Sequence, residues 1–189
     1  MSHWCSWPLL VPGWRTGAIR RRTRPHACAL RHRRSVVRPA LLRIARFTGR
    51  DQTEARDLVL AGLAEHWGEI DPSLNPDLDD IAAAYRDGAF LIGRSGARLV
   101  ATGALVRRSP DVAELVRMSV VHDLRRSRVG SRMFDYLRRE AGVLGVRRII
   151  AETSAEWTGA VALYTSLGFA VTHRSEGQFG LEVWFARDI

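Results

Sequence analysis

The stretch from Met118 to Met133 joins an apolar run to a loop of Arg, Ser and Gly, and then to the start of a helical pattern. A junction of this kind presents backbone N–H groups without intrahelical partners, together with the positive end of a helix dipole. Both features bind anions, and four side chains add charge suited to a pyrophosphate: Arg125, Arg126, Arg128 and Arg132. The alternative is an ordinary solvated helix start, and the local pattern leaves both interpretations open.

The flanking patterns predict the elements that must position this loop. Residues 112–121 are expected to form a strand, and apolar positions at three- and four-residue spacing from Val129 predict a helix ending near Gly142–Gly145. Residues 147–153 are expected to form the next strand. Because a strand, a helix and a strand follow one another with short connections, the two strands should lie parallel.

The other patterns after residue 40 complete one mixed sheet with helices on its faces. Thr48 and Asp51 are expected to cap the first helix, and Asn75 followed by Pro76 to start the second. The fold class is therefore α+β, a single central mixed sheet with about seven strands and about four helices. The remaining predicted strands are 41–47, 89–93, 98–106, 169–173 and 180–185, and the remaining helices are 52–67, about 75–85 and 157–167.

Residues 1–40 have a composition of their own, with nine Arg, no acidic residue and both cysteines of the chain. Residues 41–189 carry 20 Arg against 20 Asp and Glu, so the net charge of +9 belongs to the first forty residues. A neutral body counts against nucleic-acid binding by the folded part. We expect residues 1–40 to be a basic unstructured extension or to follow from a misassigned start, and residues 41–189 to form one domain.

Three other interpretations of residues 1–40 stay open: an organellar transit peptide, a basic arm for nucleic acid or anionic lipid, and a zinc site. The zinc interpretation is weak because Cys5, His26, Cys28 and His32 do not have the spacing of paired ligands, and no metal is expected. No apolar run approaches the ~20 residues of a membrane span. The cysteine-free body suits a reducing cytoplasm.

Two motifs resemble those of the Gcn5-related N-acetyltransferase (GNAT) family. The loop reads Arg125-Arg126-Ser127-Arg128-Val129-Gly130, similar to the family's (Q/R)xxGx(G/A) between a strand and a helix. Residues 162–169 read Ala-Leu-Tyr-Thr-Ser-Leu-Gly-Phe, close to the usual ALYxxLGF. The two motifs stand at the family's separation, and the resemblance covers about 150 residues, including the opening strand and two helices.

The resemblance implies the GNAT fold, with a parallel strand pair at the acetyl-CoA cleft, and an enzyme that acetylates a primary amine by direct attack in a ternary complex. The backbone of Met118, Ser119 and Val120 would pair with the pantetheine, and an amide near Val120 could stabilise the oxyanion. The implied pyrophosphate site consists of Arg125, Arg126, Ser127, Arg128, Val129, Gly130, Ser131 and Arg132.

The resemblance also implies roles in proton transfer and acceptor binding. Tyr164 matches the proposed general acid, which by its pattern alone would be a packing tyrosine. Glu114 is the better candidate for the general base, because some histone-acetylating members carry Glu at a similar distance from the loop, and His122 is a weaker one. His66 and Trp67 fall where the family builds its acceptor pocket, with Glu69 and Asp71 after them.

Two positions depart from the family's pattern. Arg128 replaces the first Gly of the loop motif, so the expected close approach of the backbone to the phosphate is in question there, and the Arg side chain offers another way to reach it. Trp157 replaces the Asn that often begins the last helix. The segment from Asn75 to Ile81 resembles one found in a subset of the family, without indicating a substrate.

Three functions from different classes follow. The first is the N-acetyltransferase, with acetyl-CoA as donor cosubstrate and a small-molecule or peptide amine as acceptor. The second is an acyl-CoA-binding or sensor module of the same fold without turnover. The third is a nucleic-acid-associated protein that acts through its basic arm. The acceptor and the oligomeric state, a homodimer included, stay open.

Overall fold

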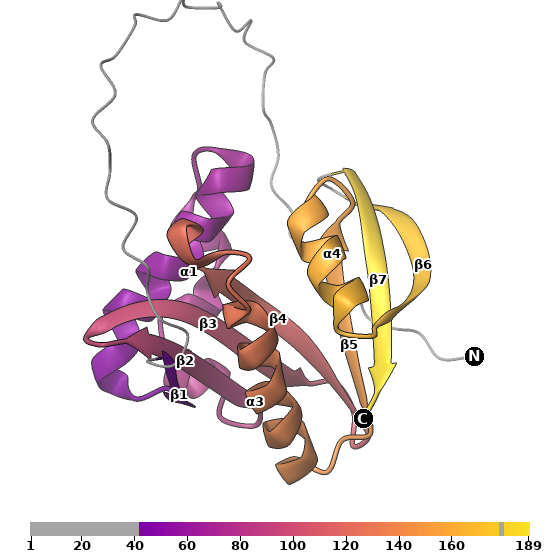
Figure 1. Cartoon of the computed structure of the whole chain (residues 1–189), viewed down its shortest axis with the longest axis horizontal. Helices are drawn as coiled ribbons and strands as arrows, with labels where there is room; N and C mark the ends of the chain where they lie inside the picture. Colours follow the sequence, from indigo (N-terminus) through magenta and orange to yellow (C-terminus); the bar gives the residue numbers. More distant parts are fainter. Residues whose placement is uncertain (1–41, 178–179) are drawn as a thin grey trace, which may run out of the picture. The chain divides into compact units, whose positions relative to one another are not determined.

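The computed structural model describes residues 42–177 and 180–189, which form one seven-stranded mixed sheet with helices on both faces (Figure 1). The strand order is β1-β2-β3-β4-β5-β7-β6. The strands are β1 (Leu42–Arg46), β2 (Ala89–Ser95), β3 (Arg98–Arg107), β4 (Val112–Val120), β5 (Arg148–Ser154), β6 (Ala170–Gly177) and β7 (Gly180–Asp188). The helices are α1 (Gln52–Trp67), α2 (Ile81–Ala84), α3 (Val129–Val143) and α4 (Thr158–Ser166).

Of the strand pairs in this sheet, β4 and β5 are parallel, as predicted for the strands on either side of the loop helix, and the others are antiparallel. The parallel pair follows from the α3 crossover, which returns the chain to the end of the sheet where β4 begins. The predicted fold class is therefore confirmed, with seven strands and four α-helices in the described part of the chain. The described residues contain no helix with the length and apolar character needed to cross a membrane. The expectations for residues 1–40 lie outside the described residues.

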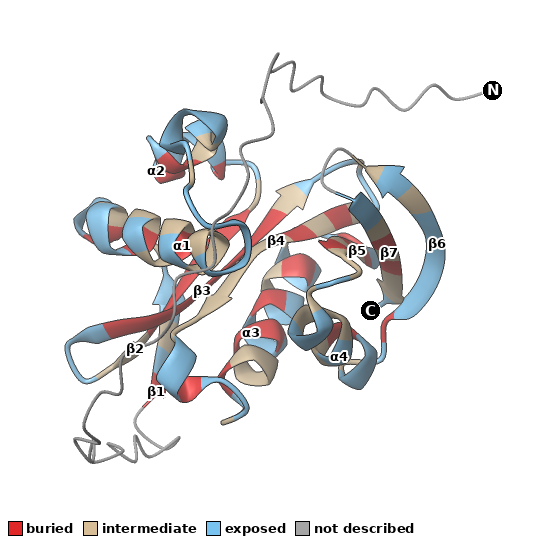
Figure 2. Ribbon diagram, turned by 90° about the horizontal axis from the view of Figure 1, so that it is seen from above, coloured by how far each residue is buried: buried red, intermediate tan, exposed pale blue. Residues whose placement is uncertain are grey.

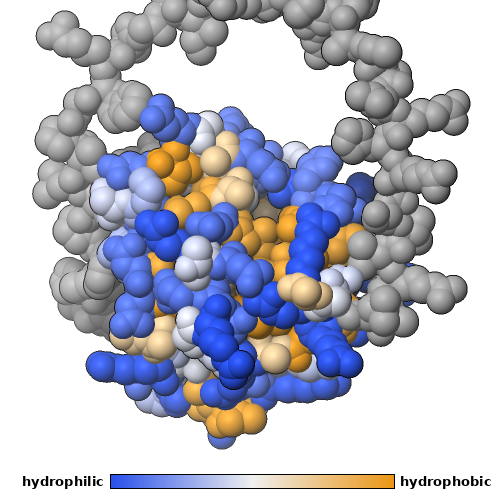
Figure 3. All heavy atoms as spheres, turned by 90° about the vertical axis from the view of Figure 1, so that its left-hand side faces the viewer, coloured by the Kyte–Doolittle hydropathy of each residue, from blue (hydrophilic) through white to orange (hydrophobic). Residues whose placement is uncertain are grey.

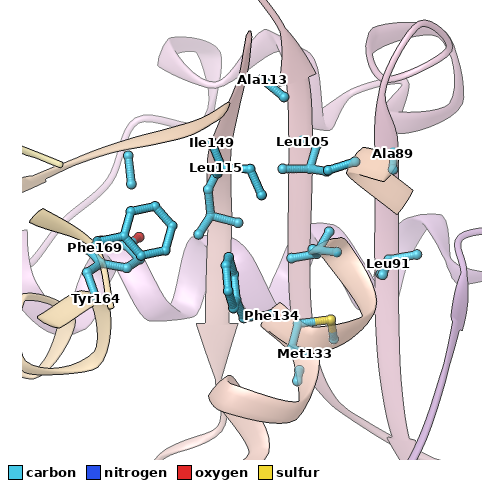
Figure 4. Packing of buried hydrophobic residues seen from close by; sticks show 14 of the residues in the cluster. Ala89, Leu91, Leu105, Ala113, Leu115, Met133, Phe134, Ile149, Tyr164 and Phe169 are labelled. Atoms are coloured by element: carbon cyan, nitrogen blue, oxygen red, sulfur yellow. The ribbon is translucent and has the colours of Figure 1, made fainter. Parts of the chain in front are cut away.

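Two hydrophobic cores lie on opposite faces of the sheet, because side chains alternate along each strand (Figure 2). In β2, Ala89 and Leu91 pack toward α3, whereas Phe90 and Ile92 pack toward α1 and α2. The larger core joins Met133 and other α3 residues to the strands; Figure 4 shows it with Phe134 beneath Leu115 and with Tyr164 beside Phe169. The outer surface seen in Figure 3 is mostly hydrophilic, with hydrophobic residues in smaller groups between.

The start of α1 confirms the predicted capping residues. The Thr48 amide and hydroxyl both donate to the Asp51 carboxylate, at 2.9 and 2.8 Å, within a short 3₁₀ turn (Gly49–Asp51) that leads into the helix. Arg94 of β2 also donates to Asp51, at 2.9 Å. This reciprocal capping satisfies groups that have no partner inside the helix and ties its start to the sheet.

The second helix is shorter than predicted. In place of a helix over about 75–85, the chain forms two 3₁₀ turns, Pro72–Leu74 and Pro76–Leu78, before the four-residue α2. Asn75 caps no helix with its side chain, which instead accepts a hydrogen bond from Arg117 of β4. Local capping signals predicted a helix here, but tertiary hydrogen bonds use the same polar groups.

The strands β4 and β5 diverge after a short common ladder. Their pairs end at Leu115 and Ala151, although β4 continues to Val120 and β5 to Ser154 (Figure 1). Along its other edge β4 stays paired with β3 as far as Val120. One edge of the backbone from Val116 to Val120 is therefore left unpaired by β5.

Candidate active site

The predicted anion loop leads into the first turn of α3, as expected from its sequence. A 3₁₀ turn (His122–Leu124) follows β4, and α3 begins at Val129 with Arg128 as its N-cap residue. Arg128 has a backbone φ of +66° and Arg126 a φ of +61°, both in the left-handed region. Arg128 therefore adopts the conformation that glycine favours at this motif position, and the backbone amides of the first α3 turn point out of the helix end.

The loop arginines divide into two groups by their partners. The Arg125 guanidinium donates to the Val120 carbonyl at 3.1 Å and pairs with Glu65 of α1 at 2.6 Å, and Arg132 donates to the Leu42 carbonyl at 3.2 Å. Arg126 and Arg128 are exposed, with no side-chain partner within residues 42–177 and 180–189. The exposed pair is thus the one whose charge is available to an anion.

The donor backbone predicted from sequence also borders a pocket of about 250 Å³. Its wall includes Ser119 and Val120 of β4 together with Gly62 of α1. The closeness of α1 depends on that glycine, because a Cβ there would lie 3.2 Å from the Ser119 hydroxyl oxygen. The pocket is further lined by Leu58, Ala61, Glu65, Arg98, Val121, His122, Asp123 and Arg125.

Tyr164 of α4 is 5% exposed and lies against Phe169 and Phe185, with ring centroids 5.6 and 5.4 Å away (Figure 4). Its hydroxyl makes no hydrogen bond to any of the described residues. Burial raises the pKa of Tyr164, and the carboxylates of Glu152 and Glu114 raise it further. The phenol is therefore held in its protonated form, the form that a general acid needs.

Glu114 is held by an ion pair. Its carboxylate accepts from Arg108 at 2.6 Å, and only 13% of its side chain is exposed. Glu152 of β5, which the sequence reasoning did not single out, has no hydrogen bond or ion pair with any described residue and lies just beyond the last β4–β5 pair. The alternation of β5 shows why it was missed: Ala151 and Thr153 are buried in the core, so Glu152 resembles an ordinary outward-facing strand residue.

Three carboxylates share the sheet face opposite α3 and α4. Burial raises the pKa of Glu152 to about 7, and the charges of Glu182 on β7 and Glu114 on β4 add to the shift. A carboxyl group with a pKa near neutrality is matched to accept a proton at physiological pH. The Glu152 carboxylate raises the pKa of Tyr164, so the two side chains lie near each other beside the diverging strands.

The predicted acceptor residues meet the start of α4. The ring of His66 stacks on Trp157 at a centroid distance of 4.2 Å, and Trp67 lies 4.8 Å from the same ring. Trp157 is the N-cap residue of α4 and makes no side-chain cap. The residue that departs from the family's pattern therefore joins the end of α1 to the beginning of α4. Glu69 and Asp71 are exposed in the turn after α1, and Asp71 accepts from the Ser73 amide.

Residues 54–169 match the sequence profile of the acetyltransferase (GNAT) family, more than half of the chain. This span contains the diverging strands, the loop and both sequence motifs. The chain belongs to the GNAT family. The family places it among acetyl-CoA-dependent acyltransferases, which the geometry of the loop and of Tyr164 accommodates.

Relatives of this GNAT protein include an IAA acetyltransferase of Azospirillum brasilense, 28% identical over 120 residues, or 62% of this chain and 76% of that protein. An acetyltransferase structure from Streptococcus agalactiae is 18% identical, with a TM-score of 0.70 over 79% of this chain and 99% of that one. A GNAT family acetyltransferase from Elizabethkingia anophelis with acetyl-CoA bound is 13% identical, with a TM-score of 0.64 over 79% and 99% of the two chains. These two structures share the fold.

No group of three or more His, Cys, Asp or Glu side chains within the described ranges is arranged to hold a metal ion. The zinc candidates Cys5, His26, Cys28 and His32 lie outside those ranges.

Proposed function

We propose that this GNAT protein is an N-acetyltransferase that transfers the acetyl group of acetyl-CoA to a primary amine. One observation supports this most: the buried, protonated Tyr164 and Glu152, which no described residue pairs with, flank the point where β4 and β5 diverge. An amine acceptor must lose a proton and a thiolate leaving group must gain one, so the reaction needs an acid and a base at one place.

The chain's residues fit the donor. Acetyl-CoA supplies the acetyl group as a thioester. The pyrophosphate of its CoA part would be held by the first-turn amides of α3 and by the exposed Arg126 and Arg128. The backbone of Met118, Ser119 and Val120 has one edge that β5 leaves unpaired, and this edge would hold the pantetheine as an added strand beside the Val120 carbonyl that Arg125 holds. Gly130 lets α3 pack closely against α4, because a Cβ there would lie 3.3 Å from the Leu163 side chain. The side chains of Arg125 and Arg132 have partners within the protein, and their amides donate to the His122 and Arg128 carbonyls, so neither residue is assigned a direct contact with the pyrophosphate.

Each side chain then has one task in the transfer. The amine nitrogen forms a bond to the acetyl carbon as the bond from that carbon to sulfur breaks. The proton lost by the amine goes to the Glu152 carboxylate, and Tyr164 gives its proton to the sulfur. A backbone amide near Val120 would stabilise the oxygen charge that develops between these events.

We assign the base to Glu152 and keep Glu114, the expectation from sequence, as the alternative. Glu114 must break its pair with Arg108 to accept a proton, whereas Glu152 has no such pair with any residue that the structure describes. Both carboxylates act on Tyr164, so either lies near the reacting atoms. Variants that replace Glu152 and Glu114 one at a time show which carboxylate is the base.

The acceptor would enter past His66 and Trp67. Aromatic rings at the entrance and the three carboxylates on the sheet each favour a cationic amine over an anionic one. The runner-up function, an acyl-CoA sensor without turnover, shares the donor site and needs neither Glu152 nor Tyr164. We further propose a cytoplasmic location, where acetyl-CoA and a reduced chain meet.

The test measures acetyl transfer to a panel of amines by the full chain and three variants. The release of the CoA thiol is the readout. We expect Glu152→Gln and Tyr164→Phe each to lower kcat/KM for the amine by about a hundredfold or more, and Glu114→Gln to lower it less. In the wild type, kcat/KM should rise with pH through about 7 as Glu152 ionises, and this rise should be absent in Glu152→Gln. Donor binding without turnover by any amine would favour the sensor.

A further inference from the structure

A second set of residues, outside the site, contacts β4, whose Met118–Val120 backbone is proposed to hold the pantetheine. Arg117 stands in the middle of β4 with a backbone φ of +54°, in the left-handed region that a side chain seldom adopts inside a strand. The β3–β4 register shifts here, since Ala104 pairs with Val116 but Thr102 pairs with Ser119. Gly103 therefore faces two residues, and Arg117 occupies the position of a β-bulge where glycine is usual.

The bulge is held from both sides. The Thr102 hydroxyl donates to the Arg117 carbonyl at 2.9 Å, and Thr102 is fully buried. The Arg117 guanidinium makes two hydrogen bonds to Asp77, at 2.9 and 2.5 Å, and one to Asn75 at 2.9 Å. The buried Tyr85 donates to the same Asp77 carboxylate at 2.6 Å. We call Arg117, Asn75, Asp77, Tyr85 and Thr102 the Arg117 network.

The network explains what the irregular segment before α2 does. Asn75 and Asp77 come from its 3₁₀ turns, which the sequence presented as a helix start, and neither side chain caps a helix. Arg117 is 20% exposed and Asp77 27%, so the bidentate pair is largely shielded from water. A strained backbone conformation persists where several independent contacts fix it, and the hydrogen bonds of the Arg117 network do so here.

We propose that Asn75 and Asp77 are positioning residues, which hold Arg117 in the left-handed conformation and thereby aim the backbone of Met118–Val120 at the donor. The direction of the amides after the bulge depends on the φ of Arg117, because a bulge reorients the strand that follows it. Met118 comes directly after the bulge. This inference rests on the proposed function, in which those amides hold the pantetheine.

A comparison of Arg117→Gly with Arg117→Ala tests it. Both variants lose the guanidinium, but glycine adopts a φ of +54° without a Cβ penalty, whereas alanine does not. We expect Arg117→Ala to weaken acetyl-CoA binding by about tenfold in Kd, which corresponds to about 1.4 kcal/mol, and Arg117→Gly to stay close to the wild type. Asp77→Asn, which keeps the side-chain shape, should weaken it by a smaller factor.

Three measurements use the same samples of the full chain: calorimetric titration with acetyl-CoA, thermal unfolding, and NMR spectra of the backbone amides. The amide signals of Gly103, Met118 and Ser119 should move in Arg117→Ala and remain in place in Arg117→Gly. Equal weakening in the two variants would overturn the inference, because it would show that the ion pair itself matters and not the backbone it holds. Unchanged binding in Arg117→Ala would overturn it as well.

The same samples separate this inference from the proposed function. If the wild type does not bind acetyl-CoA, the proposed function fails, and the amide signals still decide whether the network holds the bulge. In active enzyme, mispositioned amides should raise KM for acetyl-CoA and lower kcat while KM for the amine stays constant. A network that only stabilised the fold would lower the unfolding temperature and leave those constants unchanged.

Discussion

At the scale of single residues, the site combines side chains whose surroundings oppose their usual behaviour. Arg128 occupies a left-handed position, Tyr164 is a buried phenol, and Glu152 is a half-buried carboxyl group with no hydrogen bond or ion pair among the described residues. Each arrangement costs folding free energy, and such costs concentrate where a protein binds or reacts. Replacing these residues therefore yields effects on stability and function that differ in sign.

Glu152 predicts a dependence of stability on pH. Its pKa is raised to about 7 in the folded chain, so between its ordinary range and pH 7 the folded state binds more protons than the unfolded state. The free energy of unfolding should then fall as the pH rises through this interval. Glutamine carries no charge at either pH, so Glu152→Gln should unfold at a higher temperature than the wild type at pH 8, with a smaller difference at pH 5.

Calorimetric scans at the two pH values measure this effect. Glu182→Gln should have a smaller effect of the same sign, because it removes one of the charges that raise the pKa of Glu152 and leaves Glu152 in place. An equal difference between Glu152→Gln and the wild type at both pH values would contradict the raised pKa.

Arg128 predicts a contrast between glycine and alanine. A left-handed residue with a Cβ costs about 1–2 kcal/mol relative to glycine, so Arg128→Gly should be more stable than Arg128→Ala by about 1 kcal/mol in chemical denaturation. Acetyl-CoA titration of the same pair shows how the loop holds the phosphate. Weakening in both variants would indicate the Arg side chain, and weakening in neither would indicate the backbone alone. Equal stability of the two would contradict the strained conformation.

At the scale of the elements, the contact between β3 and the β4 bulge needs a residue without a side chain. A Cβ on Gly103 would lie 2.7 Å from the Met118 sulfur and 2.8 Å from Leu137 of α3. Gly103→Ala should therefore destabilise the fold by about 1–3 kcal/mol through overpacking. Gly142 lies near the end of α3, and an added Cβ there would meet nothing within 4 Å. Gly142→Ala should therefore stabilise the fold, because alanine favours the helix more than glycine does.

Thermal unfolding of the two glycine variants and the wild type checks both signs. A Gly103→Ala variant as stable as the wild type would show that the bulge accommodates a methyl group, and the close packing around Met118 would then be incorrect.

The elements were predictable where a single period or motif determined them. Apolar spacing from Val129 identified α3, and the strand on each side of it implied the parallel pair. The segment after α1 was predicted incorrectly, because Asn75 and Pro76 carry a helix-start signal while Arg117, forty-two residues away, takes the Asn75 side chain. A partner at that separation leaves no periodic trace.

The candidate site divides in the same way. Two local motifs predicted the loop and Tyr164 as site residues, whereas Glu152 lies in an ordinary strand alternation and was not predicted. Its raised pKa depends on burial and on Glu182 and Glu114, which come from two other strands. The stacking of His66 on Trp157 likewise joins elements that are distant in sequence. Tertiary neighbours, and not residue type, make these positions functional candidates.

At the scale of the whole molecule, the described chain is one mixed sheet that separates two cores and opens between β4 and β5. The loop before α3, which we propose binds the donor, lies with α3 on one side of this opening, and the three carboxylates lie on the opposite face of the sheet. Donor and acceptor would thus approach from different sides, which suits direct transfer in a ternary complex.

The central claim is that the first turn of α3 holds the donor, and calorimetric titration of the full chain with acetyl-CoA tests it most directly. Ser131→Glu places a carboxylate in that turn, where it suits the helix dipole but repels a pyrophosphate. Gly142→Glu adds the same group at the other end of α3 as the control. We predict saturable binding by the wild type and Gly142→Glu and a loss of at least about tenfold in Ser131→Glu, without a lower unfolding temperature. Equal binding by all three, or no binding by the folded wild type, would contradict the claim.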